Sequence, residues 1–290
     1  MRTSEEAKTY ACEVTSRCLT GEESERRLQY FRRQLDGATT KEMKDIWRSQ
    51  IEKVETWLTS EKFLTGNFAH GIDELMLELI EWRALKYAFQ NVQTEQSPFM
   101  DHVFFMQWLI GGTYAVFALL GKLVSNTRGD SSLRRLWSTV SDSIRKDGAC
   151  SDEEIKHINQ NIFGSSGYFA SNGSRALQYR HFVVAHNVRN PTLKWSEIDK
   201  DIEILVRIWS IIGSWSSFGL YEPFRTPDQA ISGLDPYFSP YELKRLKDTR
   251  QEYLNRVTQW SLNYLHNGQR DPARGIFSKL VVTALRFPNR

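Results

Sequence analysis

The stretch from Val103 to Gly121 constrains the fold more than any other part of the sequence, because its nineteen residues include no charged side chain. A run of this length is close to what a helix needs to cross a lipid bilayer. Gln107, Thr113 and three glycines lower its hydropathy, however, and a helix that is apolar on all sides is also typical of the centre of a large bundle. There the glycines would let neighbouring backbones approach closely. We therefore expect a buried core helix, with a membrane anchor as the alternative.

Apolar residues elsewhere recur every three or four positions, which is the spacing of one face of an α-helix, and strand-like alternation is almost absent. Eight prolines and 17 glycines are also few for a β-rich protein with many turns. The apolar stripes are Met43, Trp47, Ile51, Val54 and Leu58; Leu75, Leu79, Trp82 and Phe89; Ile198, Ile202, Leu205, Trp209 and Ile212; and Leu243, Leu246, Tyr253, Val257, Trp260 and Tyr264. The sequence therefore predicts an all-α fold, a helical bundle with additional N- and C-terminal helices.

Two serines mark where helices should begin. Residues 164–174 are rich in Gly, Ser and Asn, and they end at Ser174, whose side chain is suited to cap a following helix. Ser196 is placed to cap the next helix, with Asp199 as an acidic residue three positions later. We expect one helix from about Ser174 and another from Ser196.

Half of the eight prolines lie between residues 223 and 240, and no long helix survives that density. This break predicts a link between a central bundle and a C-terminal helical part. We expect an N-terminal helical arm at residues 1–65, a helical bundle at 66–220 and a basic helical region at 221–290.

The basic character of the chain is concentrated near its C-terminal end. Residues 241–290 contain ten Lys or Arg and four Asp or Glu, which gives them a local charge of +6 within a net charge of +3 for the whole chain. A basic stretch of this kind attracts nucleic acid. The alternative is a solvated helix face that is rich in lysine and arginine.

Several common classes of site are missing from the sequence. The three cysteines form no CxxC pair, and the first residues lack the apolar core of a signal peptide, so we expect a cytoplasmic protein. There is no GxxxxGK[ST], no GxGxxG after a strand, no HExxH and no GxSxG. These absences argue against P-loop, dinucleotide-binding, zincin and α/β-hydrolase functions, and we expect neither a metal nor a cofactor.

Two of the six histidines, His181 and His186, lie just behind Arg180. Histidine exchanges a proton at cellular pH, and arginine binds phosphate oxygens in bidentate fashion. Together they suit attack of an RNA 2′-hydroxyl on the adjacent phosphate without a metal. On one ideal α-helix Arg180 and His186 would be roughly 9 Å apart along the axis and about 120° apart around it. They cannot form a tight dyad there, but two such helices around a two-fold axis would bring both pairs into one cleft.

The sequence Arg180-His181, four further residues and His186 resembles the R-x(4–6)-H signature of HEPN-domain proteins, in which Asn, Asp or His follows the arginine. Residues 179–212 are similar to abortive-infection HEPN proteins of the AbiU type. The resemblance implies a HEPN-like helical bundle, a homodimer with the motif at its interface, and endoribonuclease activity in phage defence or toxin–antitoxin systems. It makes Arg180 and His186 catalytic and His181 accessory, with RNA as the substrate. An antitoxin or nucleotidyltransferase partner stays open, as do the residues that bind RNA.

A second hypothesis makes the chain a non-catalytic HEPN-like module for dimerisation or for binding RNA or a protein. The helical parts on either side of the expected bundle favour it, because they exceed what a small nuclease needs. Steep loss of RNA affinity with added salt, without cleavage products, would distinguish this module from a nuclease.

Overall fold

The computed structural model spans the chain and describes residues 3–15, 21–61, 64, 71–92, 103–170, 173–185, 193–217 and 230–262. All regular structure in these residues is helical and none of it is strand, so the predicted all-α fold is confirmed. His186 and residues 263–290 of the basic C-terminal stretch lie outside the described residues. The chain divides into two compact units, one of residues 1–15 and 72–290 and one of residues 16–71.

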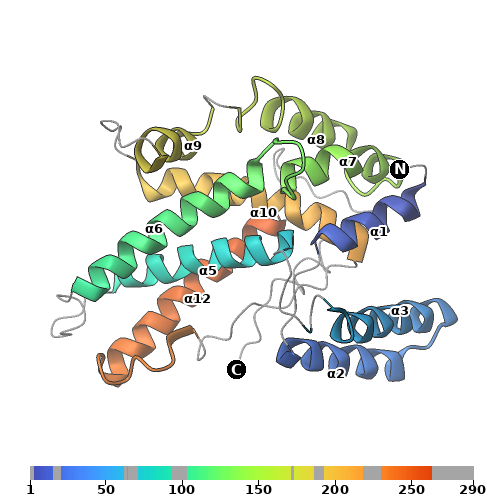
Figure 1. Cartoon of the computed structure of the whole chain (residues 1–290), viewed down its shortest axis with the longest axis horizontal. Helices are drawn as coiled ribbons and strands as arrows, with labels where there is room; N and C mark the ends of the chain where they lie inside the picture. Colours follow the sequence, from blue (N-terminus) through green and yellow to red (C-terminus); the bar gives the residue numbers. More distant parts are fainter. Residues whose placement is uncertain are drawn as a thin grey trace. The chain divides into compact units, whose positions relative to one another are not determined.

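The smaller unit contains a helical hairpin of α2 (Gly21–Gly37) and α3 (Lys41–Leu58), which pack side by side (Figure 1). Thr40 caps α3 through its side-chain oxygen. Phe31 of α2 stacks on Trp47 of α3, with ring centroids 5.8 Å apart. Part of the apolar stripe predicted for α3 therefore packs against α2.

The larger unit is a bundle built around α5 and α10, whose residues are largely buried. In Figure 1, α5 runs between α6 and α12, and it packs against both. α10 packs against α1, α7, α9 and α12. The elements are α1 (Ser4–Thr15), α5 (Ile72–Asn91), α6 (Val103–Val124), α7 (Leu133–Lys146), α8 (Asp152–His157), η1 (Ile158–Ile162), α9 (Arg175–Tyr179), η2 (Arg180–Ala185), α10 (Trp195–Ser217) and α12 (Pro240–Leu262).

Both α1 and α12 belong to this bundle, which differs from the boundaries expected at residues 65 and 221. Ala7 and Ala11 of α1 are fully buried, and α1 packs against α7 and α10. Tyr253 and Val257 of α12 lie in the main hydrophobic core. Because its apolar stripe packs on α5 and α10, the described C-terminal helix is part of the core rather than an appendage.

Buried arginines join the core helices through carboxylates. A guanidinium taken out of water needs a close anion, so each such pair fixes the position of two helices. The pairs are Arg83 of α5 with Asp199 of α10 at 2.7 Å, Arg250 of α12 with Glu81 of α5 at 2.5 Å, and Arg207 of α10 with Glu154 of α8 at 3.1 Å.

Helix α6 is buried over only part of its length. In its C-terminal half Val116, Leu120 and Leu123 are almost fully buried, whereas in its N-terminal half Val103 is 73% and Met106 51% exposed. The prediction of a helix buried on all sides is therefore wrong for the N-terminal half. Residues 105–124 are long and apolar enough to cross a membrane by length and composition, and 39% of their most apolar window is buried.

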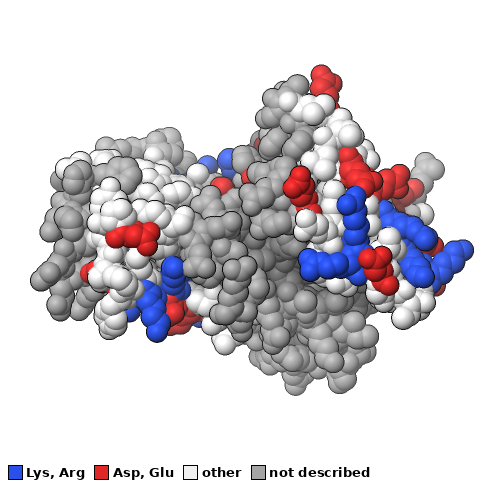
Figure 2. All heavy atoms as spheres, turned by 90° about the horizontal axis from the view of Figure 1, so that it is seen from below, with Lys and Arg blue, Asp and Glu red and all other residues white. Residues whose placement is uncertain are grey.

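Charges of both signs are mixed on the described surface. On the face shown in Figure 2, Lys and Arg side chains lie next to Asp and Glu side chains rather than in one continuous patch. The described part of the basic C-terminal region shows the same mixture, since Arg256 of α12 pairs with Glu252 at 2.6 Å.

Candidate functional site

The segment that carries the R-x(4–6)-H motif is anchored at its start. Helix α9 begins at Arg175, and Ser174 caps it by accepting a hydrogen bond from the backbone N–H of Leu177, which confirms the predicted start. The same Ser174 hydroxyl donates a hydrogen bond to Asp201 of α10. One side chain therefore both begins the helix and fixes it to α10.

Asp201 is the buried end of this anchor, with 1% of its surface exposed. It also accepts a 2.7 Å hydrogen bond from the Tyr168 hydroxyl. Burial raises the pKa of Asp201 to about 6, although the hydrogen bonds from Ser174 and Tyr168 act in the opposite direction. The loop before α9 is thus held on α10 at two points by one carboxyl group.

Residues Arg180–Ala185 form the π-helical segment η2 instead of continuing α9 as an α-helix. In a π-helix the hydrogen bonds run from residue i to residue i+5, so side chains point in different directions from those of an α-helix. The ideal α-helical geometry assumed for Arg180 and His186 therefore does not hold over this segment. π segments are frequent at functional sites, but η1 is also π-helical and buries Ile158 and Ile162 in the core. The π geometry alone does not identify a site.

Arg180 is the exposed first residue of η2, and its guanidinium lies against α6 at Gly121. A Cβ atom added at Gly121 would lie 2.5 Å from Arg180 Nε and 2.6 Å from Cζ, so only glycine leaves room for this contact. The expectation that the α6 glycines let neighbouring backbones approach is wrong here, because the atoms nearest to Gly121 belong to a side chain. Within the described residues, the side chain of Arg180 has no hydrogen bond and no ion pair, although its backbone N–H donates to Ala176 and Leu177 at the end of α9. Such a guanidinium is suited to bind a phosphate.

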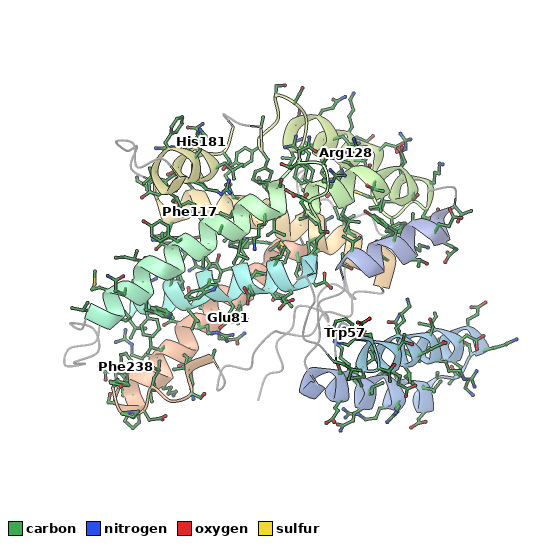
Figure 3. The ribbon with its side chains drawn as sticks, in the orientation of Figure 1. Trp57, Glu81, Phe117, Arg128, His181 and Phe238 are labelled. Atoms are coloured by element: carbon green, nitrogen blue, oxygen red, sulfur yellow. The ribbon has the colours of Figure 1, made fainter. Side chains whose placement is uncertain are left out.

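His181 lies beside Arg180 on the same segment and is also exposed. The rings of His181 and Phe182 meet edge to face, with their centroids 5.1 Å apart, and Phe182 is 43% exposed. Figure 3 shows His181 on the turn after α9, above Phe117 of α6. Two of the three predicted site residues are therefore together on an exposed segment, and the third, His186, lies outside the described residues.

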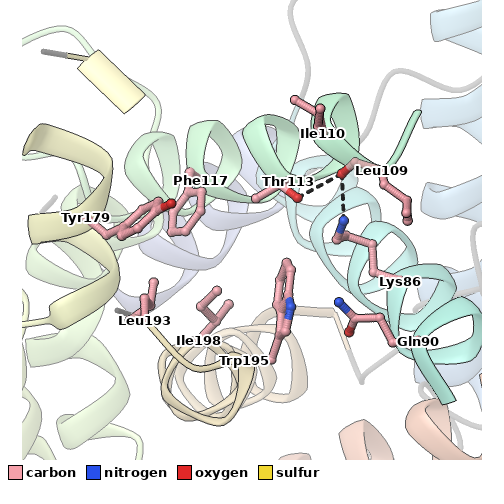
Figure 4. Close-up of a pocket in the computed structure, with 10 residues that line it drawn as sticks. All are labelled: Lys86, Gln90, Leu109, Ile110, Thr113, Phe117, Tyr179, Leu193, Trp195 and Ile198. Carbon is pink, nitrogen blue, oxygen red and sulfur yellow. Dashed lines mark hydrogen bonds between the residues drawn. The ribbon is translucent and has the colours of Figure 1, made fainter. Parts of the chain in front are cut away.

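A cavity of about 350 Å³ lies next to this segment, between α5, α6, α9 and the start of α10 (Figure 4). Its volume is within the range of small-molecule sites. Tyr179, the residue before Arg180, lines the cavity and stacks on Phe117 of α6 with ring centroids 5.0 Å apart. The other lining residues are Lys86, Gln90, Leu109, Ile110, Thr113, Leu193, Trp195 and Ile198.

Lys86 supplies the positive charge of this cavity although only 2% of its surface is exposed. Its Nζ donates a 2.6 Å hydrogen bond to the carbonyl oxygen of Leu109 and lies 5.2 Å from the centre of the Trp195 ring. Burial, and secondarily the charge of Arg83, lower the pKa of Lys86 to about 8. An ammonium group has three donors, and no second acceptor bonds to Lys86 within the described residues. The cavity therefore offers a donor to a ligand oxygen.

The predicted cap of α10 at Ser196 is wrong. The helix begins one residue earlier, at Trp195, and Glu197 accepts a 2.9 Å hydrogen bond from the backbone N–H of Lys194. This is the back-bond of a capping box, in which Lys194 occupies the cap position where Ser, Thr, Asp or Asn is usual. The expected first-turn acid, Asp199, instead pairs with Arg83.

Sequence reasoning also missed Lys86 and Asp201. Lys86 had a signal, because it occupies the next position of the apolar stripe that runs through Leu79 and Trp82 of α5. A lone cation on a buried helix face indicates a special environment. The sequence contains no comparable signal for Asp201, because its partner Tyr168 lies far from it in the chain, in the loop before α9.

No protein-family model matches the chain, and comparisons with curated proteins and with solved structures also find no match. Among the described residues, no group of three His, Cys, Asp or Glu side chains is placed to hold a metal ion.

Proposed function

We propose that the protein is a metal-independent endoribonuclease of the HEPN type, with Arg180 and His186 as catalytic residues and His181 as an accessory residue. The observation that carries the proposal is the exposed guanidinium of Arg180. It has no carboxylate partner among the described residues, whereas the buried arginines of the core each have one. An arginine left without an acid at an exposed position is suited to an anionic substrate.

The proposed reaction transfers the phosphoryl group within RNA. A histidine accepts the proton of a 2′-hydroxyl, whose oxygen attacks the adjacent phosphorus. The bond from phosphorus to the 5′-oxygen breaks, and that oxygen takes up a proton. Arg180 stabilises the negative charge on the phosphoryl oxygens. The products carry a 2′,3′-cyclic phosphate and a 5′-hydroxyl.

We further propose that two copies form the site, and the exposed face of α6 supports this. Each residue advances an α-helix by about 100°, so Val103, Ile110, Tyr114 and Gly121 fall within about 20° of one line. The first three are 73%, 44% and 52% exposed, and Arg180 covers the fourth. An apolar stripe of this kind marks an interaction surface. A second copy on it would lie next to Arg180 and bring a second Arg180 to the site.

By the same resemblance we place the protein in the cytoplasm, off the membrane, in phage defence or a toxin–antitoxin system. An antitoxin or nucleotidyltransferase partner belongs to that proposal. Recovery of the full chain only from the membrane fraction would contradict the location and favour the anchor interpretation of α6.

The test uses full-length wild type, Arg180→Ala, His186→Ala and, as a matched surface control, Arg145→Ala. Each is incubated with RNA in EDTA, and the rate and product ends are determined. We expect wild type and Arg145→Ala to yield cyclic phosphate ends and the two site variants to be roughly 100- to 1,000-fold slower. A wild type that cleaves nothing, or site variants that cleave equally well, would remove the catalytic assignment. Salt-sensitive RNA binding without cleavage would favour the non-catalytic module.

A further inference from the structure

We infer that the cavity beside Arg180 binds the base of a nucleotide, one that carries a carbonyl oxygen, while Arg180 binds its phosphate. This inference deepens the proposed function and depends on it for the role of Arg180. The existence and the lining of the cavity do not depend on the proposed function. Its walls, its polar edge and its distance from Arg180 each fit one part of a nucleotide.

The walls of the cavity are aromatic on two sides. The Trp195 ring stands on one side, and the stacked pair of Phe117 and Tyr179 stands on the other (Figure 4). Bases bind single-stranded nucleic-acid proteins by stacking on such rings, because every base has a flat π face. Leu193 and Ile198 add apolar surface to this lining, whose polar side chains include Lys86, Gln90 and Thr113. A flat ring therefore fits this space better than a flexible chain.

The polar edge of the cavity is rich in donors. The buried ammonium of Lys86 uses one donor on the Leu109 carbonyl oxygen, to which the Thr113 hydroxyl also donates at 2.8 Å. Gln90 adds a side-chain amide at the same edge. A buried cation gains most from a ligand atom that accepts a hydrogen bond. Uracil, cytosine and guanine present a carbonyl oxygen there, and adenine does not.

The position of Arg180 completes the argument. Phe117 at the cavity and Gly121 under the Arg180 guanidinium are four residues apart on α6, which is about 6 Å along its axis. Tyr179 and Arg180 are adjacent in the chain. A base in the cavity thus has a phosphate-binding group one helical turn away, a separation that a single nucleotide spans.

The experiment is calorimetric titration of the full-length protein with uridine 5′-monophosphate, adenosine 5′-monophosphate, uridine and inorganic phosphate. We expect uridine monophosphate to bind roughly tenfold more tightly than each of the other three. Lys86→Met should weaken that binding about tenfold and abolish the preference for uracil over adenine. Arg180→Ala should reduce the affinity for uridine monophosphate to that for uridine. Lys146→Met, at the end of α7, removes an exposed lysine and should change nothing.

A second variant distinguishes loss of binding from a folding defect. Thr113→Phe places a ring in the existing cavity and should block uridine monophosphate while circular dichroism and the melting temperature stay near those of wild type. The inference is overturned if folded Lys86→Met and Thr113→Phe bind like wild type, or if wild type binds uridine monophosphate no better than phosphate. RNA cleavage is measured in parallel. RNA cleavage without mononucleotide binding would contradict only this inference. Mononucleotide binding without RNA cleavage would contradict only the proposed nuclease activity.

Discussion

Arginines have opposite surroundings in two regions of the larger unit. In the core formed by α5, α10 and α12, Arg83 and Arg250 are 3% and 0% exposed and each meets a carboxylate. On the surface formed by α6 and η2, Arg180 is exposed and lies on Gly121. Its side chain has no carboxylate partner among the described residues. The core arginines therefore hold helices together, whereas Arg180 has no such partner and, as we propose, binds an anionic substrate.

The largest effect is expected in the core. Arg250→Met leaves Glu81 buried without its partner and should lower the free energy of unfolding by about 3–5 kcal/mol. The exposed pair of Arg256 and Glu252 gives the matched control, since Arg256→Met should cost less than about 1 kcal/mol. Urea denaturation measures both. Equal losses in the two variants would mean that burial does not separate the two kinds of arginine.

On the surface side, the exposed stripe of α6 should carry the dimer. Tyr114→Glu should weaken self-association by roughly 30-fold, because a charge would enter the centre of an apolar interface. Tyr241→Glu changes a tyrosine of α12 that is 69% exposed and should leave association unchanged. Sedimentation equilibrium gives both constants. A wild type that is monomeric at all concentrations would contradict the two-copy site.

The anchor between the two regions should respond to pH. The pKa of Asp201 is raised from its ordinary value of 3.8 to about 6, so the folded state binds a proton more tightly than the unfolded state. Stability from this group is full below about pH 4 and is lost as the pH rises through 6, by about 3 kcal/mol. Asp201→Asn should lack this component between pH 4 and 6. Parallel pH profiles of unfolding for both proteins would show that Asp201 does not titrate as described.

The smallest change tests whether the contact with Gly121 positions the Arg180 side chain for RNA cleavage. Gly121→Ala adds one methyl group where the Arg180 guanidinium lies, so the flexible side chain must move away. RNA cleavage should fall about tenfold, while helix propensity adds up to about 1 kcal/mol of stability. Gly111→Ala is the matched control on the same helix, because nothing lies within 4 Å of the added atom. It should gain stability at full activity; identical activity in both variants would show that the contact with Gly121 does not position Arg180.

The sequence predicted the helices best where a long helix buries a regular apolar stripe. All five members of the stripe from Ile198 to Ile212 are buried on α10, as expected. The start of α9 followed from Ser174, whose capping role is local. The membership of α1 and α12 in the bundle could not be predicted, because periodicity shows which face is apolar and says nothing of which helix covers it.

The candidate site was predictable only in part. The residue types at 180 and 181 suggested phosphate chemistry, but the π-helical turn at η2 has no sequence pattern that distinguishes it from α-helix. The contact between Arg180 and Gly121 joins residues far apart in the chain. The cavity likewise takes its walls from four elements, so no single stretch of sequence reveals it.

The most direct measurement follows the arginine side chains themselves. Nuclear magnetic resonance of protein with ¹⁵N-labelled arginine records each Nε–Hε group, and Arg180→Lys identifies the Arg180 signal by its loss. The titrant is 2′-O-methyl RNA, which lacks the attacking hydroxyl and stays intact. We predict a large shift of the Arg180 signal and none for Arg83, Arg207 or Arg250, which are held by carboxylates. An unchanged Arg180 signal at saturating RNA would contradict its assignment as the phosphate-binding residue.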